Sequence, residues 1–200
     1  MTAELLGLIT IGIAFFSYGF YLSDVFHGKT KPHGLSWLIW GILNTLIWYQ
    51  QMTHGAGPGA WVTGVAAIAN FVIFLTAFKY GERNITKLDW LCGGFALVAI
   101  AAWAVSPNGT ISTTLACVVF ILGLIPTFRK SLVNAHEETA ITFALNSLKF
   151  LVALFALQAV TFTTAAYPLV LFLANGFFAI FLISRAITTR RPSQKRPKKR

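Results

Sequence analysis

The feature that most constrains this chain is a succession of seven apolar segments separated by short polar clusters. Clusters rich in polar, glycine and proline residues divide the 200 residues into segments at about 4–26, 35–52, 60–79, 89–105, 110–128, 139–160 and 167–187. A helix needs about 20 apolar residues to cross the hydrocarbon core of a bilayer. Because the seven segments take up most of the chain, little remains for a soluble domain. The pattern predicts an all-α integral membrane protein with seven transmembrane helices.

The composition agrees with this interpretation. Hydrophobic residues make up 56% of the chain and charged residues 11%, whereas soluble domains contain about 25% charged residues. Apolar segments recur along the whole chain, so a removable signal peptide does not account for the apolar excess. We expect a multi-pass protein of the plasma (inner) membrane.

The basic residues predict how the chain is oriented. Of 16 Lys and Arg residues, 15 lie in the first, third and fifth breaks or at the C-terminal end, and the second, fourth and sixth breaks hold none. Cytoplasmic loops are enriched in Lys and Arg. This alternation predicts an N-terminus outside and a C-terminus in the cytoplasm.

Most of the excess positive charge lies in a short tail, residues 189–200. The net charge is +10, and it falls to +3 without the seven cations of residues 190–200. A basic run can indicate nucleic-acid binding, but this one directly follows an apolar helix. Attraction to the anionic lipids of the cytoplasmic leaflet explains it more simply. We expect the tail to contact lipid, and we expect no nucleic-acid partner.

Four asparagines lie deep in apolar segments, where an amide costs free energy unless it finds a partner. Asn44 and Asn146 are 102 residues apart, and Asn70 and Asn175 are 105 residues apart. The sequences around the second pair also resemble each other. The spacing matches the first three segments to the last three and leaves the fourth unmatched. The sequences of segments one and five, however, do not align at either offset.

This internal repeat predicts two parallel three-helix bundles joined by a linker helix. Three helices end on the opposite face from where they began, so one more helix is needed before a second copy can enter in the same orientation. The expected boundaries are 1–80 for the first bundle, 81–108 for the linker and 109–188 for the second bundle. Transporters built from such repeats place the substrate site near mid-membrane at the repeat interface.

With this order of helices, the chain resembles the PQ-loop superfamily, and within it the SWEET-like (MtN3/saliva-type) transporters. The resemblance implies a central cavity between the bundles, with Asn70 and Asn175 of the third helices in contact with the solute. It also implies hinge prolines near the cytoplasmic ends of the first helices, which here correspond to Pro32 and Pro126. The sequence has no literal Pro-Gln pair, so the subfamily and the solute stay open.

Three further residues of the second and sixth segments are candidate substrate-binding residues. Asn44 and Asn146 could contact the solute or pack within their bundles, and all four amides could instead form interhelical hydrogen bonds. Trp40 lies too deep for the interfacial aromatic belt. It could stack on a ring-bearing solute or pack against a neighbouring helix.

Lys149 is the most unusual residue of the apolar segments. Inserting an ionisable side chain at mid-membrane costs on the order of 3 kcal/mol, so such a residue is a candidate functional residue by default. Lys149 lies one turn from Asn146 and shares its helix face, and no acid is present at its depth. It could face the cavity and attract an anionic solute, or it could snorkel or lose its proton.

Other titratable residues lie near the ends of the segments. Asp24, near the cytoplasmic end of the first segment, joins Pro32 and Pro126 as a candidate hinge or gate residue and is the one candidate for proton coupling. The lack of mid-membrane acids favours facilitated diffusion. His33 and His136 could sense protons or could be ordinary solvated loop residues. Neither Cys92 nor Cys117 has a nearby partner that would suggest a disulfide or a zinc site.

These observations predict a transporter that moves a small polar solute, a sugar or small organic metabolite, by alternating access. The alternative is a seven-helix receptor that binds a ligand, a cargo or a retinal-type group at Lys149 without transport; a protonated Schiff base would need a counter-ion that is missing at that depth. We find no paired acid and base groups and no metal cluster of the kind enzymes need, so we expect no enzyme, no cofactor and no metal. Homo-oligomerisation is left open.

Overall fold

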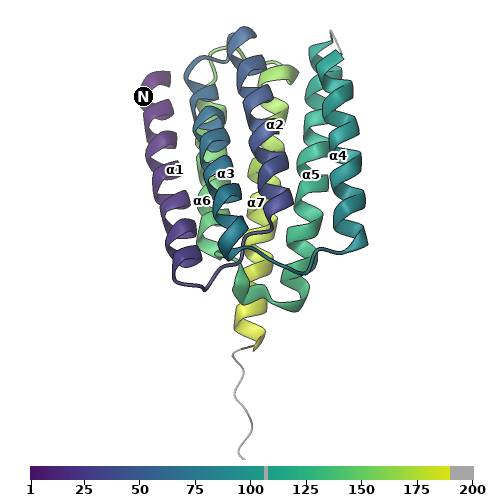
Figure 1. Ribbon diagram of the computed structural model, residues 1–200. Helices are drawn as coiled ribbons and strands as arrows, with labels where there is room; N and C mark the ends of the chain where they lie inside the picture. The colour runs from purple at the N-terminus through teal and green to yellow at the C-terminus, as the bar shows by residue number, and fades with distance from the viewer. Residues whose placement is uncertain (106–107, 190–200) are drawn as a thin grey trace, which may run out of the picture.

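The computed structural model describes residues 1–105 and 108–189, and these form seven α-helices that stand side by side (Figure 1). The helices are α1 (Ala3–Phe26), α2 (Gly34–Thr53), α3 (Trp61–Tyr80), α4 (Lys87–Val105), α5 (Gly109–Val133), α6 (Ala140–Phe155) and α7 (Phe162–Thr189), with short 3-10 turns η1 (Gly57–Ala60) and η2 (Ala135–Glu137). The prediction of an all-α protein is confirmed. The basic residues 190–200, predicted to contact lipid, lie outside the described part.

The helices pack in a repeating order. Helix α3 packs against both α1 and α2, and helix α7 packs against both α5 and α6. The trio α1–α3 meets the trio α5–α7 mainly where α1 packs against α6 and α2 against α5. Helix α4 lies at one side of the molecule, mainly against α5 (Figure 1). The middle of the molecule is therefore surrounded by six helices, and α4 stands outside them.

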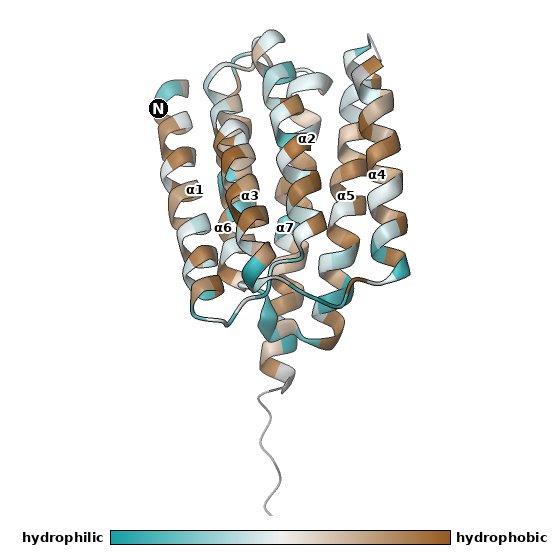
Figure 2. Cartoon of the chain, viewed as in Figure 1, coloured by the Kyte–Doolittle hydropathy of each residue, from teal (hydrophilic) through white to brown (hydrophobic). Residues whose placement is uncertain are grey.

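The distribution of side chains is that of a membrane protein. Large apolar side chains such as Phe15, Phe95 and Ile180 are exposed, while polar ones such as Gln51 and Lys149 are buried. Figure 2 shows apolar residues along the helices and hydrophilic ones gathered at the connecting loops. Four helical stretches, α1, η1 with α3, α5 and α7, are long and apolar enough to cross a membrane.

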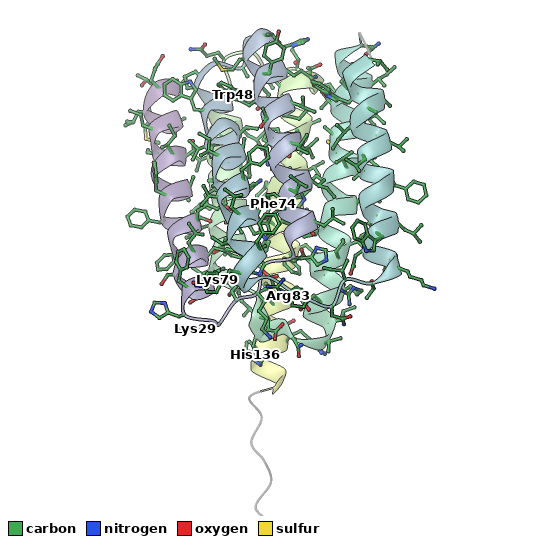
Figure 3. The ribbon with its side chains drawn as sticks, viewed as in Figure 1. Lys29, Trp48, Phe74, Lys79, Arg83 and His136 are labelled. Atoms are coloured by element: carbon green, nitrogen blue, oxygen red, sulfur yellow. The ribbon has the colours of Figure 1, made fainter. Side chains whose placement is uncertain are left out.

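The basic loops gather at one end of the molecule. Figure 3 labels Lys29, Lys79, Arg83 and His136 at this end, where α7 also ends. We call it the basic end and the other the opposite end. The basic end is the one that the distribution of Lys and Arg predicts to face the cytoplasm.

Two helix ends differ from the predicted segments. Helix α5 continues to Val133 and not to residue 128, so Arg129 and Lys130 are helical. Helix α6 ends at Phe155 and not at residue 160. The following residues instead pair with the loop before η1: the Gln158 N–H donates to the Ala56 carbonyl at 3.1 Å. The backbone groups after α6 are therefore satisfied by another loop.

Helix α7 begins at Phe162, although the sequence 161–168 was predicted to be a break. Pro168 lies inside the helix, and a proline has no N–H to donate to the carbonyl four residues earlier. That carbonyl belongs to Thr164, and Gln51 of α2 donates its side-chain Nε2 to it at 3.0 Å. The prediction failed because a side chain from another helix replaces the bond that proline removes.

Candidate functional site

A small cavity lies between the six central helices. Its volume is about 20 Å³, roughly the room that one water molecule needs. Side chains from α1, α2, α3, α5, α6 and α7 line it, and none comes from α4. The lining residues are Tyr18, Trp37, Trp40, Asn44, Ala66, Asn70, Phe120, Phe143, Asn146, Phe150, Leu171 and Asn175.

The cavity brings together five of the six residues that the sequence suggested for solute binding, namely Asn44, Asn70, Asn146, Asn175 and Trp40. The sixth, Lys149, is not a lining residue. Sequence reasoning also missed the aromatic walls, for which Tyr18 and Phe120 are examples. Aromatic residues are common in every apolar segment, so no sequence signal separates those at the cavity from those facing lipid.

The four amides differ in how much of their hydrogen-bonding capacity is used. Asn44 donates to the Trp40 carbonyl at 2.9 Å and accepts from the Tyr167 hydroxyl at 3.1 Å. Asn175 donates to the carbonyl one turn earlier in its own helix, at 2.8 Å. The Asn70 side chain makes no hydrogen bond to any residue in 1–105 or 108–189. Asn70 therefore offers both amide atoms to the cavity.

Trp40 both lines the cavity and packs against a neighbouring helix. Its ring stacks on Phe120 of α5, with centroids 5.6 Å apart and planes at 27°. Its Nε1 donates to the Phe120 carbonyl at 3.2 Å. A Cβ atom at Gly123 would lie 2.7 Å from this nitrogen, so α5 admits the indole only because that position is glycine.

Lys149 lies behind the cavity wall. Its side chain is fully buried, and its Nζ donates to the Tyr18 hydroxyl of α1 at 2.9 Å. The amine also lies 4.0 Å from the Tyr18 ring centroid and 5.2 Å from that of Phe150. The amine does not snorkel toward either end. Since Tyr18 and Phe150 both line the cavity, the amine is one side chain away from it.

A buried ion pair closes the basic end beneath the cavity. Lys130 of α5 donates to the Glu138 carboxylate, and both side chains are almost inaccessible, at 3% and 0% exposed. The Tyr21 hydroxyl of α1 donates to the other Glu138 oxygen at 3.2 Å, and it accepts from the Trp37 indole at 3.2 Å. Burial raises the pKa of Glu138, while the Lys130 charge opposes that rise. These contacts tie α1, α5 and the start of α6 together.

The three predicted hinge or gate residues lie at the same end, and none lines the cavity. The Pro32 carbonyl accepts from the Glu82 N–H at 2.9 Å, and Pro126 lies inside the unbroken helix α5. Asp24 accepts from Thr139 at 3.0 Å. The structure places these residues but leaves their predicted motion a hypothesis.

His33 is not the solvated loop residue that the sequence allowed for. Its side chain is fully buried, and its Nδ1 lies 3.1 Å from the Ser36 hydroxyl. Its Nε2 has no hydrogen-bond partner in the described part of the chain and lies 3.6 Å from Asp89, whose carboxylate Arg129 binds at 2.8 Å. Burial lowers the pKa of His33 more than the nearby Asp89 raises it.

The opposite end is closed by neutral hydrogen bonds. Gln50 of α2 donates to Thr113 at 2.9 Å and to the Gly109 carbonyl at 3.1 Å, and it accepts from the Trp103 indole at 3.1 Å. At the same end, Gln51 of α2 donates to the Thr164 carbonyl of α7. The cavity is thus shut at both ends, by charge at the basic end and by amides at the other.

The described residues contain no group of three or more His, Cys, Asp or Glu side chains that could hold a metal ion. Comparison of the chain with protein-family models, with curated proteins and with solved structures found no match. The geometry of the cavity is therefore the basis for inferring a function.

Proposed function

We propose that the protein is a membrane transporter of the SWEET-like, PQ-loop type that moves a small polar solute through the central cavity. The observation that carries this proposal is the composition of the cavity wall. Four amides and two indoles, from α2, α3, α6 and α7, converge on one enclosed space. Ligand sites are typically lined by aromatic side chains with a few placed polar groups.

In this proposal α1–α3 and α5–α7 form two parallel bundles joined by α4, with the N-terminus outside. Two equivalent contacts support the arrangement. Trp40 donates to the Phe120 carbonyl, and Thr142 donates to the Ser17 carbonyl at 3.0 Å. Trp40 and Thr142 are 102 residues apart, the offset of Asn44 and Asn146, and Ser17 and Phe120 are 103 apart. These contacts support a register of 103 residues between the first and fifth helices, for which the sequences themselves show no match.

Helices α2, α4 and α6 would cross the membrane although they are shorter or more polar than the other four. Helix α2 carries Asn44, Gln50 and Gln51, and all three side chains are buried within the protein. Helix α6 has 16 residues, or about 24 Å at 1.5 Å per residue. Their polar groups face the interior, where polar residues of transmembrane segments are usually found.

Alternating access follows from the size and closure of the cavity. A solute cannot enter a space of about 20 Å³ unless helices separate at one end. The ends are closed by different groups, so one can open while the other stays shut. All six acids of the chain lie near helix ends or in loops, which favours facilitated diffusion over proton coupling.

The test is uptake by proteoliposomes of radiolabelled glucose, serine, uridine and lactate. We expect saturable uptake of at least one probe, and we expect Asn70→Ala to reduce it about tenfold, as for one lost hydrogen bond of roughly 1.4 kcal/mol. Asn134→Ala is the matched control, because Asn134 is exposed in the loop after α5. Uptake that Asn70→Ala leaves unchanged, or probe binding without uptake, would contradict the proposal; the second result would favour a receptor.

A further inference from the structure

The wall of the cavity formed by α1 and α6 carries the only ionisable amine buried within the helical core of the described residues. Lys149 is fully buried. Its amine contacts the hydroxyl and the ring of Tyr18, and the ring of Phe150. The other buried lysine, Lys130, lies at the basic end with Glu138 as its partner. Lys149 therefore differs from Lys130 in having no counter-charge among residues 1–105 and 108–189.

No carboxylate of this chain is placed to pair with Lys149. The chain has six acids, and none forms an ion pair or hydrogen bond with this amine. The titratable group that contacts it is Tyr18, across the interface from α1. A buried charge without a partner is costly, so a positively charged Lys149 favours a ligand that brings a negative charge.

Tyr18 and Asn146, the polar residues of this wall that line the cavity, are both arranged as hydrogen-bond donors. The Tyr18 hydroxyl accepts a hydrogen bond from Lys149, so its own hydrogen can be donated to a second acceptor. One turn away, the Asn146 Oδ1 accepts from the Ser17 hydroxyl at 2.8 Å, which leaves its Nδ2 to donate. Tyr18 and Asn146 both line the cavity. This wall presents two donors with a cation behind them.

The geometry points to a small carboxylate as the solute, bound by the Tyr18 hydroxyl and the Asn146 amide, with the Lys149 ammonium supplying the counter-charge. This inference rests on the proposed function and names the substrate class of the same site. A carboxylate accepts hydrogen bonds and donates none, which matches the two donors. A neutral sugar brings no charge that would keep the buried amine protonated, whereas a carboxylate does. Trp40 and Phe120 form the opposite, aromatic wall, suited to the apolar part of such an acid.

The experiment compares acids with the matching amides, because each pair differs little except in charge. Lactate with lactamide, and benzoate with benzamide, are tested as competitors of uptake in proteoliposomes and as stabilisers of the purified protein against heat. For at least one pair we expect the acid to bind at least tenfold more tightly than the amide. Equal binding of acid and amide in both pairs would overturn the inference.

Three variants assign the preference to Lys149 and Tyr18. Lys149→Met should abolish the acid preference, Lys149→Arg should keep it, and Lys29→Met, at an exposed loop position, should leave it unchanged. Tyr18→Phe removes the hydroxyl and keeps the ring, so it should weaken acid binding about tenfold even if Lys149→Met does not fold. An acid preference that survives both Lys149→Met and Tyr18→Phe would overturn the inference.

Failure of this inference and failure of the proposed function look different. Saturable uptake of glucose or uridine that depends on Asn70 but not on Lys149 would refute the carboxylate and keep the transporter. Tight binding of benzoate or lactate that depends on Lys149, without uptake of either, would keep the anion site and refute transport.

Discussion

In the proposed repeat, the two interfaces that join the helix trios are equivalent, but their chemistry differs. The α1–α6 interface is polar near the cavity, where Ser17 bonds to Asn146 and to the Thr142 hydroxyl, and Lys149 bonds to Tyr18. At the same level, the α2–α5 interface is aromatic, with Trp40 stacked on Phe120.

This difference shows how a repeated architecture can build a cavity with unlike walls. In the proposed repeat, Trp40 and Thr142 are equivalent. Each donates to a backbone carbonyl of the partner helix, but one brings an indole and the other a small hydroxyl. On the α6 side, Asn146 lines the cavity. On the α2 side, Trp40 lines it, and the Asn44 amide is already bonded to the Trp40 carbonyl and the Tyr167 hydroxyl. We expect a solute to place its polar end against α6 and its apolar part against α2.

The largest effect is expected at the basic end of the α1–α6 interface. Glu138→Gln removes the negative charge and leaves Lys130 buried, with 3% of its side chain exposed. Breaking a buried pair in this way costs about 3–5 kcal/mol. Urea titration of the purified protein in detergent micelles should show a fall in the free energy of unfolding of that size.

The exposed pair Lys31–Glu137 is the control for this prediction. Its side chains are 49% and 20% exposed, so Lys31→Met should cost no more than about 1 kcal/mol. The double change of Lys130→Met with Glu138→Leu should recover part of the loss, since no charge is then left unpaired. A loss below 1 kcal/mol for Glu138→Gln would show that Glu138 is already neutral.

A smaller effect is expected where the two interfaces are equivalent. Trp40→Phe removes the bond to the Phe120 carbonyl and part of the stacked ring, and we expect a loss of about 1–2 kcal/mol. Thr142→Val removes only the bond to Ser17, for which membrane proteins average about 0.6 kcal/mol. The same urea titrations compare the two. Equal losses would mean that the aromatic wall adds nothing to stability.

The helical pattern was predictable because it depends on local composition. Each apolar segment became a helix, and the placement of Asn70 and Asn175 indicated which helices share the middle of the molecule. The start of α7 was not predictable, because Gln51 satisfies the carbonyl freed by Pro168 from a distant position. A contact of that kind leaves no mark in the local sequence.

The candidate site was predictable in its amides and less so in its charges. An amide deep in an apolar segment is conspicuous, but Lys130 and Glu138 looked like ordinary loop residues near the ends of segments. Their pairing depends on α5 continuing to Val133 and on the loop after it folding back. A sequence pattern does not show whether a charged side chain at a helix end is exposed to water or buried in the protein.

The smallest effect is expected at the basic end of the α2–α5 interface, and it depends on pH. Burial lowers the pKa of His33 below its ordinary value of 6.5, so unfolded chains bind a proton that the folded protein does not. Stability should therefore decline as the pH falls below about 6.5, by less than about 1.4 kcal/mol per pH unit. His33→Gln should flatten this decline in thermal unfolding scans, while His27→Gln, at an exposed position of the same end, should not. A variant that keeps the full decline would place the acid sensitivity elsewhere, and stabilisation of the wild type by acid would mean that protonated His33 pairs with Asp89.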